Sequence, residues 1–131
     1  MSHGKFASLI TCMDGRVQNA GNEFMKKTFN VDYVDVITEP GPNKILSENN
    51  LNAIVDNIYK RVDVSVFSHG SDVIAVAGHY DCAGNPVNKE TQDIQTANAA
   101  KLIKAKFPDK KVIGLWIDKD FKTAEIIYTA E

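Results

Sequence analysis

Three residues of the types that bind zinc follow two apolar segments of the chain. His79 and Cys82 lie three positions apart directly after the segment 73–77, and Cys12 closes the segment 5–12. Thiolate sulfur and imidazole nitrogen are the ligands that zinc prefers in tetrahedral protein sites. The two cysteines could instead be inert thiols packed in a core. A metal site requires a fold that brings these distant parts of the chain together.

Two charged residues follow the first cysteine at alternate positions, Asp14 and Arg16. The carboxylate of Asp14 could take the fourth position on an ion held by two sulfurs and one imidazole. The arginine fork can instead pair with that carboxylate in bidentate fashion, which would hold it off the metal and leave a place for water. The pattern therefore predicts a Zn²⁺ site with Asp14 or water as fourth ligand, and Arg16 would decide between them.

The rest of the chain alternates between strand and helix patterns. Short segments rich in β-branched and aromatic residues predict strands over 5–12, 32–38, 73–77 and 111–117. Apolar residues at helical spacing predict helices over 17–29, 47–70 and 90–107. A turn at 118–120 then leads into an expected antiparallel edge strand over 121–128. Gly78 is expected to end the third strand, which places His79 and Cys82 on the loop that follows.

The pattern also predicts how the helices face the core. Ser47 is expected to cap the second helix, whose apolar side would hold Leu51, Ile54, Val55, Ile58, Tyr59, Val62 and Val66. The apolar side of the third helix would hold Ile94, Ala97, Leu102 and Ile103. We expect His69 to meet the free carbonyls at the end of the second helix, and Trp116 to lie in the core.

Alternating strands and helices predict an α/β fold with a mostly parallel sheet and right-handed crossovers. We expect a single domain over residues 1–131, flanked by helices, with strand order 2-1-3-4 and strand 5 antiparallel at the edge. In that order the winding reverses between strands one and three, and ligands bind at such a switch point, outside the carboxyl ends of the strands. Cys12, His79 and Cys82 would then converge on one ion.

Composition limits the classes of partner. The 131 residues are 44% hydrophobic and 24% charged, as in an ordinary globular protein, and the formal net charge is -2. No basic run suggests nucleic acid or an anionic membrane as partner, and no segment approaches the roughly 20 apolar residues of a membrane span. Two cysteines without a secretion signal predict a cytoplasmic protein without a disulfide.

The two motifs together resemble those of the β-class carbonic anhydrases. Cys12-x-Asp14-x-Arg16 precedes His79-x-x-Cys82, in the family's order and in a similar α/β layout. The resemblance implies that the two cysteines and the histidine hold Zn²⁺. It also implies that the aspartate and arginine form the dyad that opens the metal to water.

Other positions agree with the family's pattern or depart from it. Gly84 matches a glycine of the family's loop, while Ala83 stands where glycine is common. The family usually carries Arg-Asn-Ala-Gly-Asn after the second strand, whereas this chain has Ile37-Thr-Glu-Pro-Gly-Pro42.

The resemblance implies reversible hydration of carbon dioxide to bicarbonate by zinc-bound hydroxide, a lyase reaction. It also implies a homodimer or higher homo-oligomer, since the family's active sites are completed at a dimer interface. Two alternatives stay open. One is hydrolysis of a related small substrate such as carbonyl sulfide or carbon disulfide, and the other is a catalytically silent zinc-binding protein of the same fold.

Overall fold

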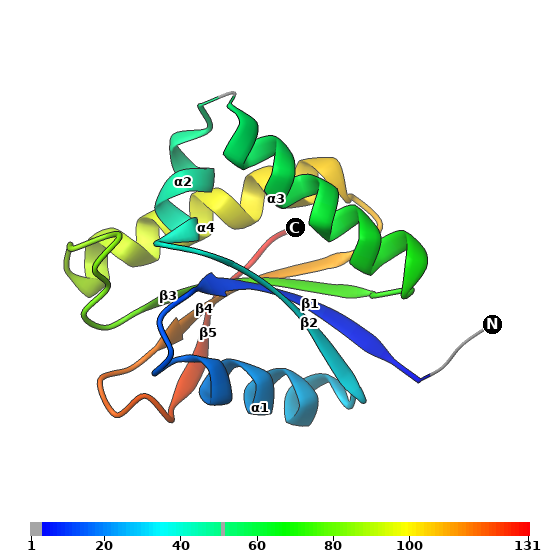
Figure 1. Ribbon diagram of the computed structural model, residues 1–131, viewed down its shortest axis with the longest axis horizontal. Coiled ribbons are helices and arrows are strands. Elements are labelled where there is room, and N and C mark those ends of the chain that lie inside the picture. Colours follow the sequence, from blue (N-terminus) through cyan, green and yellow to red (C-terminus); the bar gives the residue numbers. More distant parts are fainter. Residues whose placement is uncertain (1–3, 51) are drawn as a thin grey trace.

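The computed structural model describes residues 4–50 and 52–131, which form one α/β domain around a five-stranded sheet (Figure 1). The strands run in the order β2-β1-β3-β4-β5. All pairs are parallel except β4 with β5. The predicted order and the antiparallel edge strand are therefore confirmed. The strands are β1 (Phe6–Cys12), β2 (Tyr33–Glu39), β3 (Val73–His79), β4 (Lys111–Ile117) and β5 (Ala124–Thr129).

Helices cover both faces of the sheet unequally. Figure 1 shows α1 (Gln18–Phe29) alone below the sheet, with the other helices above it. Those above are α2 (Pro42–Glu48), α3 (Ala53–Asp63), the short π-helix η1 (Val64–Ser68) and α4 (Lys89–Lys106). Within the described residues, none of these helices has the length and apolar character to cross a membrane.

The sheet separates two cores because successive strand residues point to opposite faces. Ile10 of β1 and Val76 of β3 belong to the core under α2, α3 and α4, while Leu9 and Ala75 belong to the core above α1. β1 and β3 are direct neighbours, with Ile10 opposite Val76 in the parallel register. The carboxyl ends of these two strands therefore meet at one edge of the sheet. Trp116 is buried there, as predicted.

One helix was predicted over 47–70. The structure has the last two residues of α2 there, followed by α3 and η1. Pro42 opens α2, so Ser47 lies inside that helix and the prediction that it caps α3 was wrong. Asn52 caps α3 instead, because its side chain accepts a hydrogen bond from the N–H of Val55 at 3.0 Å. Proline suits the first turn of a helix, which has no intrahelical partner for its N–H groups. Leu51 lies outside the described residues.

The prediction of which helix residues face the core was only partly right. On α3 and η1, the predicted Val55, Ile58, Tyr59, Val62 and Val66 are buried, but Ile54 is exposed. On α4 the prediction was largely wrong, since Ile94 is 65% exposed and only Ile103 of the four is buried. The first half of the buried face of α4 is polar, with Gln92 and Thr96 turned toward the sheet.

Two strand ends also differ from the prediction. β3 continues through Gly78 and ends at His79, which pairs with Ile117 of β4. Gly78 stays in the strand because its missing side chain leaves room for Gln92: a Cβ there would lie 2.8 Å from Oε1 of that residue. β5 begins at Ala124 rather than at Phe121, because residues 118–123 form a turn closed by the N–H of Asp118 on the carbonyl of Thr123.

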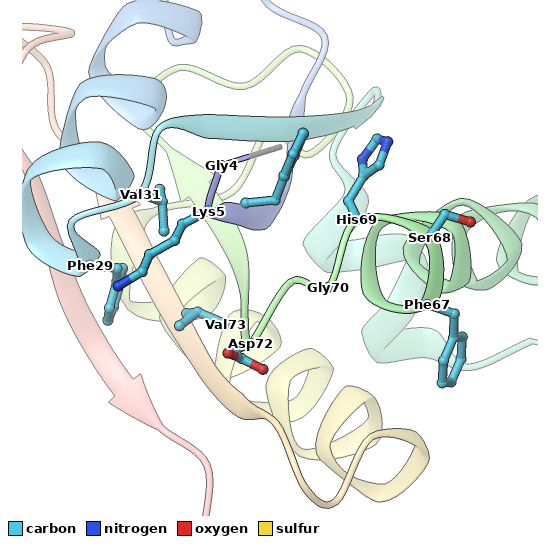
Figure 2. Close-up of a pocket in the computed structure, with 11 residues that line it drawn as sticks. Gly4, Lys5, Phe29, Val31, Phe67, Ser68, His69, Gly70, Asp72 and Val73 are labelled. Carbon is cyan, nitrogen blue, oxygen red and sulfur yellow. The ribbon is translucent and has the colours of Figure 1, made fainter. Parts of the chain in front are cut away.

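A hollow of about 680 Å³ lies at the amino ends of β1 and β3, at the opposite edge of the sheet (Figure 2). His69 stands at its rim, but its side chain does not meet the helix carbonyls as predicted; only its backbone N–H does, by donating to the carbonyl of Val66. Its Nδ1–H donates to Oδ2 of Asp35 at 2.7 Å, and its ring stacks on Phe6. The charged rim residue Asp72 pairs with Lys110. These contacts join β1, β2 and η1, and they give the side chain of His69 a structural role.

Candidate metal centre

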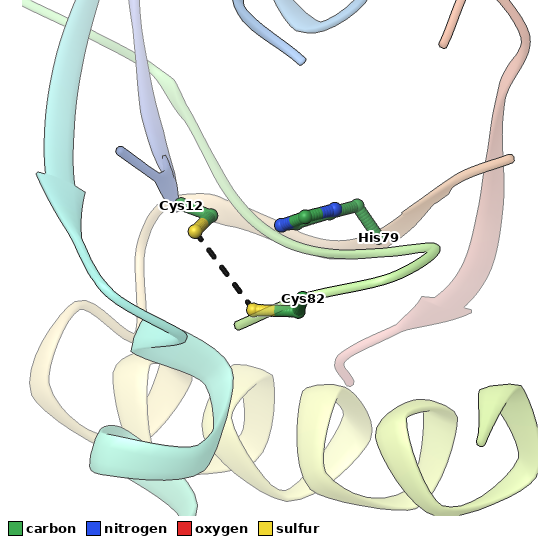
Figure 3. A group of neighbouring side chains, drawn as sticks. All are labelled: Cys12, His79 and Cys82. Atoms are coloured by element: carbon green, nitrogen blue, oxygen red, sulfur yellow. Dashed lines mark hydrogen bonds between the residues drawn. The ribbon is translucent and has the colours of Figure 1, made fainter. Parts of the chain in front are cut away.

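The three residues singled out in the sequence meet at the carboxyl ends of β1 and β3. Cys12 closes β1, His79 closes β3, and Cys82 lies on the loop after β3. One ligand atom from each residue lies within 4.8 Å of the others, and all three residues are buried. Figure 3 shows the two sulfurs facing each other with the imidazole beside them. The neighbouring positions of β1 and β3, predicted from the sequence, therefore produce a compact cluster.

The spacing of the two sulfurs fits a tetrahedral ion. Sγ of Cys12 lies 3.8 Å from Sγ of Cys82. Two thiolates bound at about 2.3 Å to one tetrahedral ion would be about 3.8 Å apart. The distance between the two sulfurs is therefore already close to the distance between two thiolate ligands of one tetrahedral ion.

The imidazole of His79 has one nitrogen bound and one nitrogen available. Its Nδ1–H donates to the carbonyl of Tyr80 at 2.7 Å. Its Nε2 is buried, and no described residue hydrogen-bonds it. A hydrogen bond from Nδ1 fixes the tautomer in which Nε2 carries a free lone pair, as in metal-binding histidines. A buried polar atom without a partner costs about 1–3 kcal/mol, and a metal ion would remove that cost.

The two thiols differ in acidity because they share a proton. A hydrogen bond from Cys82 lowers the pKa of Cys12 well below its usual value, against the opposing effect of burial, and the nearby His79 and the N–H groups of Gly41 and Asp14 add to the effect. The same contact and burial raise the pKa of Cys82. Burial lowers the pKa of His79, but the nearby Cys12 sulfur and the hydrogen bond to the Tyr80 carbonyl outweigh this effect and raise the pKa overall. One thiolate is therefore ready for a cation, and the second forms on binding.

Asp14 and Arg16 form the expected ion pair beside this cluster. Arg16 Nη2 lies 2.7 Å from Oδ2 of Asp14, and Nε–H donates to both carboxylate oxygens at 3.1 and 3.2 Å. These hydrogen bonds from Arg16 outweigh the opposing effect of burial and lower the pKa of Asp14 to about 2. The carboxylate of Asp14 is therefore paired with Arg16 and lies outside the group formed by Cys12, His79 and Cys82.

Sequence reasoning left Asp81 and Tyr80 out of the site. The structure places both near the dyad. The carboxylate of Asp81 lies 3.3 Å from Nη1 of Arg16, and its carbonyl accepts from Nη2 at 3.1 Å. The position of Asp81, between His79 and Cys82, was a signal in the sequence that could have identified it.

A buried polar network holds the backbone of His79. Gln92 of α4 accepts from the N–H of His79 at 3.2 Å and donates to its carbonyl at 2.8 Å. Asn43 of α2 donates to Oε1 of Gln92 and to Oγ1 of Thr96. These contacts explain why the buried face of α4 is polar, and they fix the last residue of β3 from above.

The turn that replaces the family's second-strand motif also contacts the cluster. Gly41 adopts a left-handed φ of 65°, and its N–H faces the sulfur of Cys12. Gly84, on the loop with Cys82, packs so closely on this turn that a Cβ would lie 2.6 Å from the backbone carbon of Pro40. The Pro40–Gly41 turn and the loop after β3 therefore close on the cluster from two sides.

A hollow of about 440 Å³ adjoins the loop that carries Cys82. Tyr80, Val87 and Trp116 give it apolar walls, and Lys89 stands at its side. Lys89 is paired with Asp93 at 2.6 Å and with Glu125 at 3.6 Å. The cluster is thus bordered by a small space with both apolar and polar walls.

Comparison with known families gives one match over nearly the whole chain. Residues 2–127 match the family described as "Putative carbonic anhydrase". No curated protein matches the chain in sequence.

Solved structures with a similar fold include carbonic anhydrases, several of them described as β-carbonic anhydrases. The carbonic anhydrase from Glaciozyma antarctica has a TM-score of 0.65 and 13% identity, covering 98% of this chain and 85% of that chain. β-Carbonic anhydrase isoform I from Trichomonas vaginalis has a TM-score of 0.63 and 17% identity, covering 95% and 83%. A tetrameric β-carbonic anhydrase from Sordaria macrospora has a TM-score of 0.62 and 11% identity, covering 96% and 81%. These similarities show the fold.

Proposed function

Since the chain belongs to the β-class carbonic anhydrase family, as a divergent member, we propose that it binds Zn²⁺ and catalyses the reversible hydration of carbon dioxide to bicarbonate. The observation that carries the proposal is the cluster of Cys12, His79 and Cys82 beside a closed Asp14–Arg16 pair. A purely structural site gains nothing from an arginine that competes for its fourth ligand. The arrangement therefore favours an open, catalytic site.

The donor set supports zinc as the metal. Two sulfurs and one imidazole suit a borderline-soft tetrahedral ion, and the unpartnered Nε2 of His79 is available to it. When bound, zinc would lower the pKa of a coordinated water and so supply hydroxide near neutral pH. Cys12, His79 and Cys82 would hold the ion, with the Tyr80 carbonyl fixing the imidazole.

The dyad would orient the reacting water. Arg16 holds both carboxylate oxygens of Asp14, so that carboxylate stays ionised and in one orientation. An ionised carboxylate can only accept hydrogen bonds. Asp14 would accept a hydrogen bond from the nucleophilic oxygen and so turn the lone pair of that oxygen toward a small linear electrophile. The apolar walls that Val87 and Trp116 give to the hollow beside Cys82 suit an uncharged molecule such as carbon dioxide.

We further propose that the chain acts as a homodimer or a higher homo-oligomer. The similarity to a protein described as tetrameric supports this assembly. The cytoplasmic location stays a prediction from the sequence.

Stopped-flow hydration of carbon dioxide on protein of measured zinc content tests the proposal. We expect zinc-dependent turnover in the native protein. In Asp14→Ala we expect full zinc content and a kcat/KM at least about 100-fold lower, since positioned proton acceptors contribute about that much.

Asp72→Ala is the matched control, because this exposed carboxylate lies at the opposite edge of the sheet. It should keep native kcat/KM. Native protein with one zinc per chain and no hydration at any pH would refute carbon dioxide hydration and leave the two alternatives, the hydrolase of a related small substrate and the silent zinc-binding protein. Undiminished turnover in Asp14→Ala would remove the dyad from the mechanism.

A further inference from the structure

Backbone strain is concentrated around one side chain, that of Arg16. Four non-glycine residues among those described have a positive φ: Asn30, Asn49, Asp81 and Phe121. Asn30 and Asn49 end α1 and α2, where the left-handed conformation is common for asparagine. Asp81 and Phe121 end no helix, and both contact Arg16. Strained residues cluster at functional sites when the surrounding structure holds them there.

Phe121 offers its ring to the guanidinium. Cζ of Arg16 lies 4.3 Å from the ring centroid, within the range of a cation–π contact. A bulky residue with φ 54° is an outlier, since its Cβ crowds the backbone. The ring is partly buried against the core above α1, and Tyr80 approaches its edge at 6.5 Å between centroids.

The turn around Phe121 is built to keep that conformation. The N–H of Phe121 donates to the carbonyl of Asp118 at 2.9 Å. The carboxylate of Asp120 accepts from the N–H groups of Lys122 and Thr123, both at 2.9 Å, and from the Thr123 hydroxyl at 2.6 Å. Four hydrogen bonds thus fix a six-residue turn whose one aromatic residue, Phe121, is partly buried and faces Arg16.

Asp81 holds the guanidinium from another side. Its carboxylate and its carbonyl both accept from Arg16, at 3.3 and 3.1 Å. The carbonyl contact depends on the backbone conformation of Asp81, with φ 58°. An exposed ion pair alone contributes little, and Arg16 is 46% exposed. The directed carbonyl and the ring therefore matter more than the charge of Asp81.

We propose that Phe121 and Asp81 are positioning residues, which fix the guanidinium of Arg16 in the orientation that binds both oxygens of Asp14. Among the described residues, the polar and ring contacts of the Phe121 and Asp81 side chains are with Arg16 and Tyr80 and not with the donor atoms of Cys12, His79 or Cys82. They act through Arg16, and they tie the β4–β5 turn and the loop between His79 and Cys82 to the dyad. The consequence for catalysis rests on the proposed function, whereas the positioning itself does not.

The test follows the Nε–Hε signal of Arg16 by NMR in ¹⁵N-labelled protein. The chain has two arginines, Arg16 and Arg61, so Arg61 is an internal reference. Protons over the face of an aromatic ring are shifted upfield. In Phe121→Leu we expect the Arg16 signal to move downfield and its heteronuclear NOE to fall, while Arg61 stays unchanged. Leucine keeps apolar bulk and the same Cβ strain, so the comparison isolates the ring.

Phe121→Tyr should restore both the chemical shift and the NOE, because tyrosine presents a similar ring face. Phe67→Leu is the matched control, since Phe67 is exposed on η1 and lies at the hollow on the opposite edge of the sheet. Asp81→Asn keeps a residue type that tolerates the left-handed region and should lower the Arg16 NOE by a smaller amount. It also serves as the test if Phe121→Leu does not fold.

An activity measurement separates this inference from the proposed function. In Phe121→Leu we expect unchanged zinc content and a kcat/KM about fivefold lower, recovered in Phe121→Tyr. If native protein has no hydration activity, the proposed function fails and the NMR measurement still decides the positioning. A native Arg16 shift and NOE in both Phe121→Leu and Asp81→Asn would overturn the inference.

Discussion

At the scale of single residues, Asp14 differs from an ordinary surface carboxylate through its neighbour. Arg16 donates to both of its oxygens, and Arg16 is in turn held by Asp81 and Phe121. The sequence predicted the pair, because two charges at alternate positions can meet without help from the fold. The contacts of Phe121 could not be predicted, since they depend on a turn that folds back from the far end of the chain.

The titration of Asp14 gives a prediction about pH. Its pKa is lowered from 3.8 to about 2, chiefly by the hydrogen bonds of Arg16. A lowered pKa means that the pair stabilises the fold above pH of about 4 and that this contribution is lost as pH falls through about 2. NMR titration of metal-free protein should give a midpoint near 2.

Arg16→Gln removes the charge and should return the midpoint of Asp14 toward 3.8. Arg61→Gln is the control, since Arg61 pairs with Glu39 on another part of the sheet edge. A midpoint near 2 in Arg16→Gln would show that Arg16 does not cause the shift.

At the scale of elements, the strands were predicted better than the helix between β2 and β3. Alternating and continuous apolar segments marked every strand to within a few residues. The segment Pro40-Gly41-Pro42 suggested only a chain break, whereas Pro42 opens α2. Proline both ends one element and begins another, so composition alone left the two outcomes open.

The buried face of α4 illustrates a second limit. Apolar spacing selected Ile94, but the helix is turned so that Gln92 meets the backbone of His79. A polar side chain in a core is recognised only from its partners, and those partners lie on other elements. The prediction failed where the fold uses hydrogen bonds instead of apolar contact.

The contact between two turns gives a prediction at this scale. Gly84→Ala would place a Cβ 2.6 Å from the backbone of Pro40 and force the turns apart. We expect a loss of about 1–3 kcal/mol in the free energy of unfolding, measured by urea denaturation, because a backbone must move. Zinc affinity should fall as well, since the two turns carry Cys82 and face Cys12.

Gly15→Ala is the matched control for this substitution. A Cβ at Gly15 would meet no described atom within 4 Å. Its free energy of unfolding should stay within about 0.5 kcal/mol of the native value. Equal stability in Gly84→Ala and Gly15→Ala would mean that the close approach of the two turns is unimportant.

At the scale of the whole molecule, sheet order decides whether the candidate centre exists. Cys12 and Cys82 come from opposite halves of the described chain, and the adjacent positions of β1 and β3 bring them together. The sequence predicted this juxtaposition through the reversal of winding between the two strands. It did not predict the Gln92 and Gly41 contacts, which depend on how α2 and α4 pack above the sheet.

A bound metal should therefore stabilise the whole fold. Ligand at 100 times its dissociation constant adds about 2.7 kcal/mol, which corresponds to a rise of roughly 10 °C in Tm for a domain of this size. We expect that rise when zinc is added to metal-free protein, measured by calorimetry. Cys82→Ser should lose stoichiometric zinc by elemental analysis and show little or no rise.

Zinc at one ion per chain in Cys82→Ser, with the native rise in Tm, would refute the assignment of Cys82 as a ligand. Asp72→Ala, at the amino end of β3 and so at the opposite edge of the sheet from the cluster, should keep both the zinc content and the rise.

The parallel pairing of β1 with β3 also sets an order of events during synthesis. A ribosome-bound chain that ends before residue 79 carries only one of the three clustered side chains, Cys12. Closing so long a loop is slow compared with local helix formation. A nascent chain would thus have to keep that thiol reduced and unclaimed until β3 has emerged and docked, so metal capture would be among the last steps of maturation.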